Sequence, residues 1–217
     1  RDIKFDLNRA EGYKNFCNKL WNAARFVLMH CETYSAAGPA RPASDAEHWI
    51  VHRLAQTLRD VDGHYADYRF DLVASELYEF TWNNYCDWFL EFAKPALQEG
   101  GGAADSMRHT MLSVLEMLLR ALHPLIPLVT EEIWQSIAPK LGIHGASIST
   151  QAYPDATQDI ADAGIAARVE TMKSAVMQVR SIRSQMGIPP AKLVPLLIEG
   201  AADDAMLAQI LGQESSL

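Results

Sequence analysis

Residues 111–122 have the sequence Met111-Leu112-Ser113-Val114-Leu115-Glu116-Met117-Leu118-Leu119-Arg120-Ala121-Leu122, and this stretch decides the fold class. Large apolar side chains recur in it at helical spacing, at positions 111, 115, 118, 119 and 122. A helix that is apolar around so much of its circumference must be surrounded by other elements. We therefore predict the central helix of an α-helical bundle, capped at its start by Asp105 and interrupted after Leu122 by His123-Pro124 and Pro127.

Three further long helices are predicted around the central one. Their expected ranges are residues 8 to about 30, 44 to about 61 and 71 to about 97, and a short helix restarts at Thr130. Asn8 with Glu11, and Ser44 with Glu47, have the spacing of N-terminal caps. The third helix carries a stripe that is typical of a core face, formed by Leu77, Thr81, Tyr85, Trp88 and Phe92. Trp82 lies off that stripe and is a weak candidate for a surface contact.

The pattern changes after Gly145, which sets the predicted domain organisation: a bundle over 1–146, and a connector, a long helix and the start of a small α/β module over 147–217. Ser147 to Tyr153 alternates like an extended strand or arm. A long helix is expected over 157–186, ended by Gly187, with a short strand at 193–198 and a helix at 203–211.

Charge is distributed unevenly along the chain. The formal net charge is −8, but residues 1–30 hold six Lys and Arg against three Asp and Glu, and residues 168–192 hold five against one. The 137 residues between them hold 8 against 19. Because screening limits the reach of charge to about 8–10 Å, a basic patch can act on an acidic body. The acidic excess argues against a general nucleic-acid binder and favours a shaped site.

Several function classes lose support from what the sequence lacks. The most apolar run, residues 117–129, is too short and too polar to span a bilayer, so a soluble, non-membrane chain is expected. Three dispersed cysteines favour a reducing cytosol. No metal site is predicted, because His48 and His52 lack a third ligand, and no catalytic residue is assigned, because no phosphate-binding glycine loop, GxSxG or Cys/His arrangement is found.

The first predicted helix has two distinct faces. Measured from Leu20 at 100° per residue, one sector predicts packing and contains Tyr13, Phe16, Cys17, Ala24, Val27 and Cys31. The opposite side carries Lys14, Asn15, Asn18, Asn22 and Arg25, with Phe26 beside the amides. Amides, cations and an off-axis aromatic ring can together read and stack unpaired bases and hold phosphate. A solvated outer face of an amphipathic helix is the alternative that the residues leave open.

Five blocks of the sequence carry a family resemblance: Arg1–Asp6 with Gly12–Phe26; Ser75–Asn83 with Cys86-Asp87-Trp88; Arg108–Thr110 through Leu122-His123-Pro124; Thr130–Gln135; and Ile182–Lys192. In consistent order over residues 1 to about 195, they resemble the bacterial valyl-tRNA synthetases. The isoleucyl and leucyl enzymes share the bundle, but the sequence Asn18-Lys19-Leu20-Trp21-Asn22-Ala23-Ala24-Arg25-Phe26 resembles the valyl type.

The resemblance implies the anticodon-binding bundle of a class I aminoacyl-tRNA synthetase. Such an enzyme joins valine to its tRNA with ATP and Mg, hydrolyses mischarged threonyl-tRNA, and works in the cytoplasm, here expected as a monomer. The chain begins at Arg1 without a methionine, and we expect the catalytic and editing domains upstream and a coiled coil downstream, so this fragment alone should use no cofactor and catalyse nothing.

The resemblance also assigns roles to residues. Arg25 and Phe26 would read and stack anticodon bases, and Asn15, Asn18 and Asn22 would supply amide donors and acceptors. Phosphates would be held by Arg9, Lys14 and Lys19. Arg180 and Arg183 would face tRNA or the active-site domain, or they are plain exposed charges. Two alternative functions remain: the same bundle from an isoleucyl- or leucyl-type enzyme, and a helical scaffold that docks a protein through Phe26.

Overall fold

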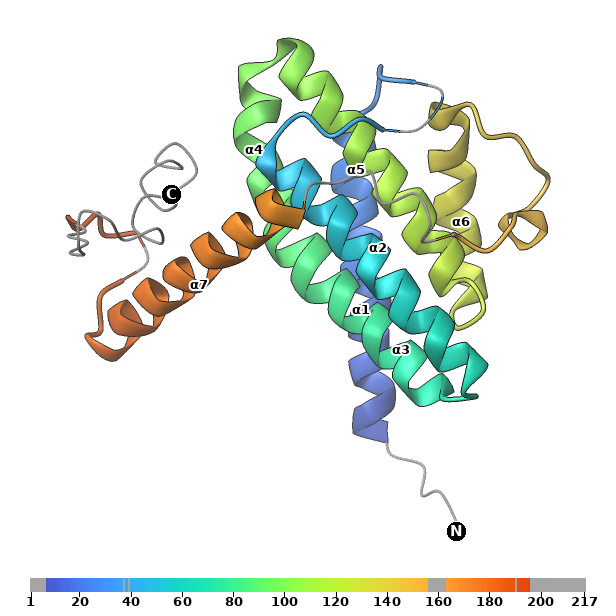
Figure 1. Ribbon diagram of the computed structural model, residues 1–217, viewed down its shortest axis with the longest axis horizontal. Helices are drawn as coiled ribbons and strands as arrows, with labels where there is room; N and C mark the ends of the chain where they lie inside the picture. The colour runs from blue at the N-terminus through green and yellow to red at the C-terminus, as the bar shows by residue number, and fades with distance from the viewer. Residues whose placement is uncertain (1–6, 37, 39, 156–162, 190, 196–217) are drawn as a thin grey trace.

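The computed structural model describes residues 7–36, 38, 40–155, 163–189 and 191–195, and all regular structure in that part of the chain is helical (Figure 1). The predicted mainly α class is confirmed. The elements are α1 (Leu7–His30), α2 (Asp45–Ala66), α3 (Phe70–Glu79), the π-helix η1 (Phe80–Phe89), α4 (Leu90–Glu99), α5 (Gly101–Leu122), α6 (Pro127–Ile137), the 3₁₀ turns η2 (Ala138–Leu141) and η3 (Ile148–Thr150), and α7 (Ala163–Gln185).

The central position predicted for residues 111–122 is confirmed, because α5 contacts α1, α2, α3, α4 and α6. Its side chains at 111, 112, 115, 118 and 119 are fully buried. The predicted start was wrong: α5 begins at Gly101, after Gly100 with φ of +78°. Asp105 therefore lies inside the helix and pairs with Arg108 at 2.8 Å instead of acting as a cap. Burial of so many apolar side chains on one helix accounts for much of the fold's stability.

The capping box at the start of α2 is confirmed. Ser44 N donates to Glu47 Oε2 at 2.8 Å, and Glu47 N donates to Ser44 Oγ at 3.4 Å. Glu47 is only 1% exposed, and its Oε1 also accepts hydrogen bonds from the hydroxyls of Ser106 at 2.6 Å and Thr110 at 2.9 Å. These donors replace the water that a buried carboxylate loses. Because Ser106 and Thr110 belong to α5, the capping residue Glu47 also connects α2 to α5.

The aromatic-rich segment is one helical path over residues 70–99, as predicted, but its middle is a π-helix. Thr81 Oγ1 donates to the Leu77 carbonyl at 2.6 Å at the point where the hydrogen-bonding pattern changes. Tyr85 is buried on the predicted stripe, whereas Trp88 and Phe92 are half-buried. The wider turn changes the register of the side chains that follow it.

Three other boundaries differ from the prediction. The backbone of α1 already begins at Leu7, so Asn8 lies inside the helix and is not its N-cap. Helix α2 continues to Ala66, beyond the predicted end at Val61. Helix α6 begins at Pro127 instead of Thr130, because proline fits the first helical turn, where its missing N–H is not needed.

The segment predicted as an extended arm over 147–153 was also wrong in part, because it contains the 3₁₀ turn η3. Glu131 Oε2 accepts from Ser147 Oγ at 2.7 Å and from Ile148 N at 3.2 Å, and this anchor lets Ile148 bury its side chain against the bundle. No strand forms at 193–195. The rest of that predicted strand and the predicted helix 203–211 lie outside the described residues.

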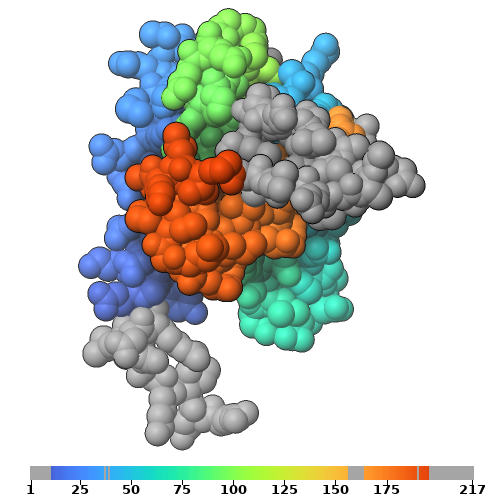
Figure 2. All heavy atoms as spheres, turned by 90° about the vertical axis from the view of Figure 1, so that its left-hand side faces the viewer, coloured from blue at the N-terminus to red at the C-terminus, as the bar shows by residue number. Residues whose placement is uncertain are grey.

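Helix α7 lies against α2 with its first half, where Ala166, Val169 and Met172 are buried (Figures 1 and 2). Further along, Met177, Ile182 and Met186 are exposed. The proposed domain boundary after residue 146 remains a prediction. None of the described helices combines the length and the apolar character needed to cross a membrane.

Candidate nucleic-acid interface

Helix α1 packs into the bundle through the predicted face. Phe16, Leu20, Ala24, Val27 and Cys31 are buried. One member of the predicted set was wrong: Tyr13 is 66% exposed.

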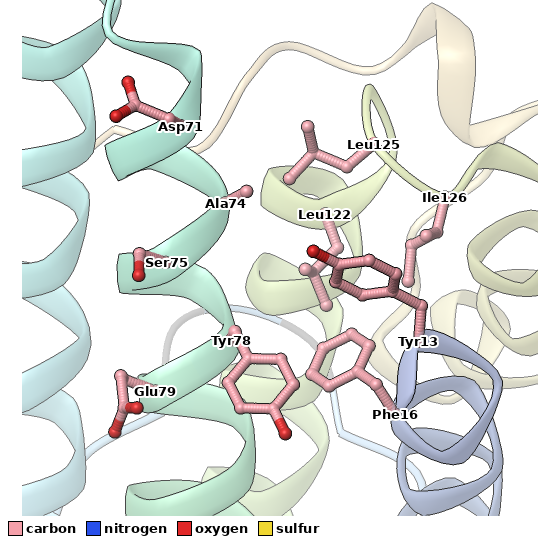
Figure 3. A pocket seen from close by; sticks show the side chains of 10 residues that line it. All are labelled: Tyr13, Phe16, Asp71, Ala74, Ser75, Tyr78, Glu79, Leu122, Leu125 and Ile126. Carbon is pink, nitrogen blue, oxygen red and sulfur yellow. The ribbon is translucent and has the colours of Figure 1, made fainter. Parts of the chain in front are cut away.

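Tyr13 is exposed because it borders a hollow beside the early turns of α1, which has a volume of about 690 Å³. Figure 3 shows Tyr13 and Phe16 on one wall, Tyr78 on the α3 wall, and Leu122 and Ile126 closing the third side. Tyr13 lines this open space and is not enclosed by neighbouring helices. The helical period therefore placed Tyr13 on the correct side of α1, but no element covers it there.

The opposite side of α1 carries a polar strip that faces solvent. Its exposed members, which we call the polar face of α1, are Lys14, Asn15, Asn18, Asn22 and Arg25. Within the described part of the chain, these side chains make no hydrogen bond or ion pair. Because α1 is packed on its other side along most of its length, the polar face is a row of uncommitted donors and acceptors on a rigid support.

Phe26 borders this polar face, but its side chain is not fully exposed to solvent. It is half-buried, packs against the core, and its ring lies 4.4 Å from the His30 ring with an interplanar angle of 56°. The exposure that contact with RNA requires is therefore found for the three asparagines and only partly for Phe26. A half-buried ring can still present one surface to a base, and its packing fixes its orientation.

Two of the predicted phosphate-binding residues need separate description. Lys19 is directed away from the polar face, toward η1: its Nζ lies 2.6 Å from Asp87 Oδ1 and 5.1 Å from the centre of the Trp82 ring. Arg9 belongs to α1, but its side chain lies outside the described part of the structure. Among the described side chains of this site, Lys14 and Arg25 are consequently the cations that are exposed and have no partner.

Sequence reasoning did not single out Trp21, which is 42% exposed on α1. It precedes Arg25 by one helical turn and follows Asn18 by three residues, so it borders the polar face on the side opposite Phe26. The same helical period that defined the packing sector places Trp21 100° from Leu20, outside that sector. That angle was the signal that could have identified it.

The second basic stretch, on α7, is engaged in contacts within the molecule. Lys173 is buried, with Nζ 4.3 Å from the centre of the Trp49 ring and 3.1 Å from Glu170 Oε2. Burial lowers the pKa of Lys173, and the nearby Glu170 opposes that effect. Trp49 Nε1 donates to Glu170 Oε1 at 2.7 Å, which joins α2 to α7.

Arg180 and Arg183, which the sequence left open between two roles, also have partners inside the chain. The Arg180 guanidinium lies 5.1 Å from the centre of the Trp88 ring. Arg183 Nη2 donates to the carbonyls of Pro189 at 2.9 Å and Lys192 at 2.8 Å. Among the described residues, the cations of α7 itself therefore have partners inside the chain, whereas Lys14 and Arg25 of α1 do not. The described residues contain no group of three or more His, Cys, Asp or Glu side chains placed to hold a metal ion.

Comparison with known proteins gives this arrangement a context. Residues 47–198 match the family described as the anticodon-binding domain of tRNA ligase. Valine–tRNA ligases from Stenotrophomonas maltophilia strain K279a and Xanthomonas axonopodis pv. citri strain 306 are 54% and 56% identical, each over 94% of this chain and 22% of the relative. The enzyme from Xanthomonas euvesicatoria pv. vesicatoria strain 85-10 is 53% identical over 100% of this chain and 23% of the relative.

The chain thus spans about a fifth of the length of these relatives. The family match begins in α2, after α1, whereas the match to the Xanthomonas euvesicatoria enzyme includes α1. Because the family match covers more than half of the residues, the chain belongs to the anticodon-binding domain family of tRNA ligases.

Proposed function

We propose that this chain binds tRNA through the polar face of α1 and acts as the anticodon-recognition part of a valine–tRNA ligase. The observation that carries the proposal is the row of exposed amides between Lys14 and Arg25, two cations without a partner among the described residues, on one side of a rigid helix. The names of the relatives support valine over isoleucine or leucine.

Each type of residue on this face suits a part of an unpaired RNA loop. Amides both donate and accept hydrogen bonds, as base edges do, so Asn15, Asn18 and Asn22 are suited to reading bases. Phe26 and Trp21 offer rings for stacking at the two borders. Lys14 and Arg9 would neutralise phosphates, and Arg25, for which the resemblance implies base reading, would add its charge to theirs; Lys19 could join them only after leaving Asp87.

The chemistry of charging belongs, in this proposal, to the rest of a longer polypeptide. That polypeptide would activate valine with ATP and Mg, hydrolyse mischarged tRNA and work as a cytoplasmic monomer. The bundle would contribute selection of the correct tRNA by its anticodon, at a distance from the reacting groups.

Titration of the chain with valine tRNA tests the proposal. Fluorescence anisotropy at 50 and 200 mM salt should show binding that weakens at higher salt, because phosphate contacts release counterions. A valine tRNA with a replaced anticodon should bind more weakly at both salt concentrations. Absence of binding, or equal binding of the two tRNAs, would contradict the proposed recognition.

A further inference from the structure

We propose that Asp87 limits non-specific RNA binding at this site, a role that rests on the proposed RNA-binding function. By holding Lys19 in an ion pair beside the polar face of α1, Asp87 keeps that cation from binding RNA phosphate, a contact that would raise the affinity for any RNA. Asp87 would not contact the matching RNA itself; it acts through Lys19. Nothing in the family description or in the names of the relatives assigns a role to this pair.

The geometry restrains Lys19 from two directions. Its Nζ lies 2.6 Å from Asp87 Oδ1 and 5.1 Å from the centre of the Trp82 ring. The Trp82 ring stacks on Tyr78 with centres 5.7 Å apart, and Tyr78 stacks on the buried Phe16 with centres 4.9 Å apart. Figure 3 shows the last two rings facing each other between α3 and α1. Three stacked rings thus support the Lys19 side chain, and the ion pair with Asp87 fixes the position of its ammonium group.

The position of the pair matters because of what lies next to it. Lys19 is one helical turn from Asn15 and from Asn22, so a phosphate that reached Lys19 would lie along the polar face. Both partners are accessible to solvent, with side-chain exposures of 33% for Lys19 and 43% for Asp87. The pair is therefore close enough to RNA to influence binding and is not part of the buried core.

Charge explains why the Lys19–Asp87 pair should limit non-specific RNA binding. A lysine–phosphate contact adds affinity for any RNA, because it reads no base. Neutralising Lys19 removes that contribution, and the Asp87 carboxylate also disfavours a phosphate at the same edge. The amides at the centre of the face are unaffected, so base recognition keeps a larger share of the binding free energy.

The test compares four proteins by anisotropy at 50 and 200 mM salt: the unmodified chain, Asp87→Ala, Lys19→Ala with Asp87→Ala, and Asp71→Ala. The last is the matched control, because Asp71 is likewise an exposed carboxylate paired with a cation, Arg69 at 2.8 Å. The probes are a valine tRNA anticodon stem–loop and the same stem with a scrambled loop. Asp87→Asn repeats the measurement if Asp87→Ala fails to fold by circular dichroism.

Asp87→Ala should strengthen binding of the scrambled loop about threefold at 50 mM salt and steepen the slope of log K against log salt by about 0.7–0.9, one added phosphate contact. The double variant should lose this gain, and Asp71→Ala should not show it. The inference is overturned by an unchanged slope in Asp87→Ala, by a gain that survives removal of Lys19, or by an equal gain in Asp71→Ala. If the unmodified chain binds neither probe, the proposed function fails; if it binds both probes as expected and only the variants disagree, this inference alone fails.

Discussion

Helices α1 and α7 carry most of the two basic stretches of the chain, and they differ in how many of their cations have partners inside the protein. On α7, Lys173 is buried against Trp49, and Arg180 lies over Trp88. On α1, Lys14 and Arg25 remain exposed and unpaired in the described part of the chain. Local charge alone therefore does not indicate an RNA site, because aromatic surfaces inside the protein can use the same cations for packing.

The comparison leads to an assignment of roles. Lys173 and Arg180 help attach α7 to the bundle, so changes in their surroundings should act on stability. The polar face of α1 contributes little to packing, so changes there should act on RNA binding. Variants that affect the two properties separately can test this distinction.

The largest expected effect is on the α7 side. Trp49→Ala should lower the free energy of unfolding by about 3–5 kcal/mol, because it removes a fully buried ring and the partner of Lys173 and Glu170. Thermal melting followed by circular dichroism should show a loss of about 6–20 °C. Below the new melting temperature, tRNA affinity should remain unchanged. A normal melting temperature would mean that α7 is not anchored here.

Phe26→Ala should have the next largest effect, divided between the two properties. Loss of a stacking ring should weaken tRNA binding by about 1–3 kcal/mol. Because Phe26 is half-buried against His30, the same change should also cost about 1 kcal/mol of stability. Phe26→Tyr keeps the aromatic ring and serves as the control for stacking. A large loss of stability with unchanged affinity would make Phe26 a packing residue only.

Removing both exposed cations of α1 should act on binding alone. The double variant Lys14→Ala with Arg25→Ala should reduce the slope of log K against log salt by about 1.4–1.8, the value for two phosphate contacts, and should weaken tRNA binding about tenfold at low salt. The melting temperature should stay within about 2 °C, because both residues are exposed and unpaired. An unaltered slope would place the phosphates elsewhere.

The smallest effect concerns stability at alkaline pH, and it has opposite signs for the two buried cysteines and for Lys173. Burial raises the pKa of Cys31 to about 11 and that of Cys86 to about 12, so the unfolded chain loses these protons first and stability falls as pH rises above 9. The lowered pKa of Lys173 on α7 acts the other way, because the unfolded chain holds that proton longer. Urea midpoints should fall between pH 8 and 10, and less so in Cys86→Ala.

Local patterns in the sequence were sufficient for much of the fold. The capping box of Ser44 and Glu47 spans three residues, and the apolar period of α5 is a property of one helix, so both could be predicted and are confirmed. The buried face of α1 followed from the same period. Tyr13 did not, because its exposure depends on where the neighbouring helices end.

Features that depend on distant residues could not be predicted in this way. Glu47 meets Thr110, 63 residues away, and Lys19 meets Asp87, 68 residues away. The family resemblance assigned Lys19 to phosphate binding, and no local pattern in the sequence indicates its acidic partner on η1. The roles of the individual residues on the polar face of α1 remain predictions that binding measurements must test.

The different roles of α1 and α7 can be separated by measuring tRNA affinity after a carboxylate is placed on each helix in turn. Asn22→Glu puts it in the middle of the polar face of α1, and Gln178→Glu puts it at an exposed position of α7. Both variants should melt like the unmodified chain. We predict that Asn22→Glu weakens valine tRNA binding at least about tenfold, whereas Gln178→Glu changes it less than about twofold. Equal effects of the two variants, or a larger effect of Gln178→Glu, would contradict the account.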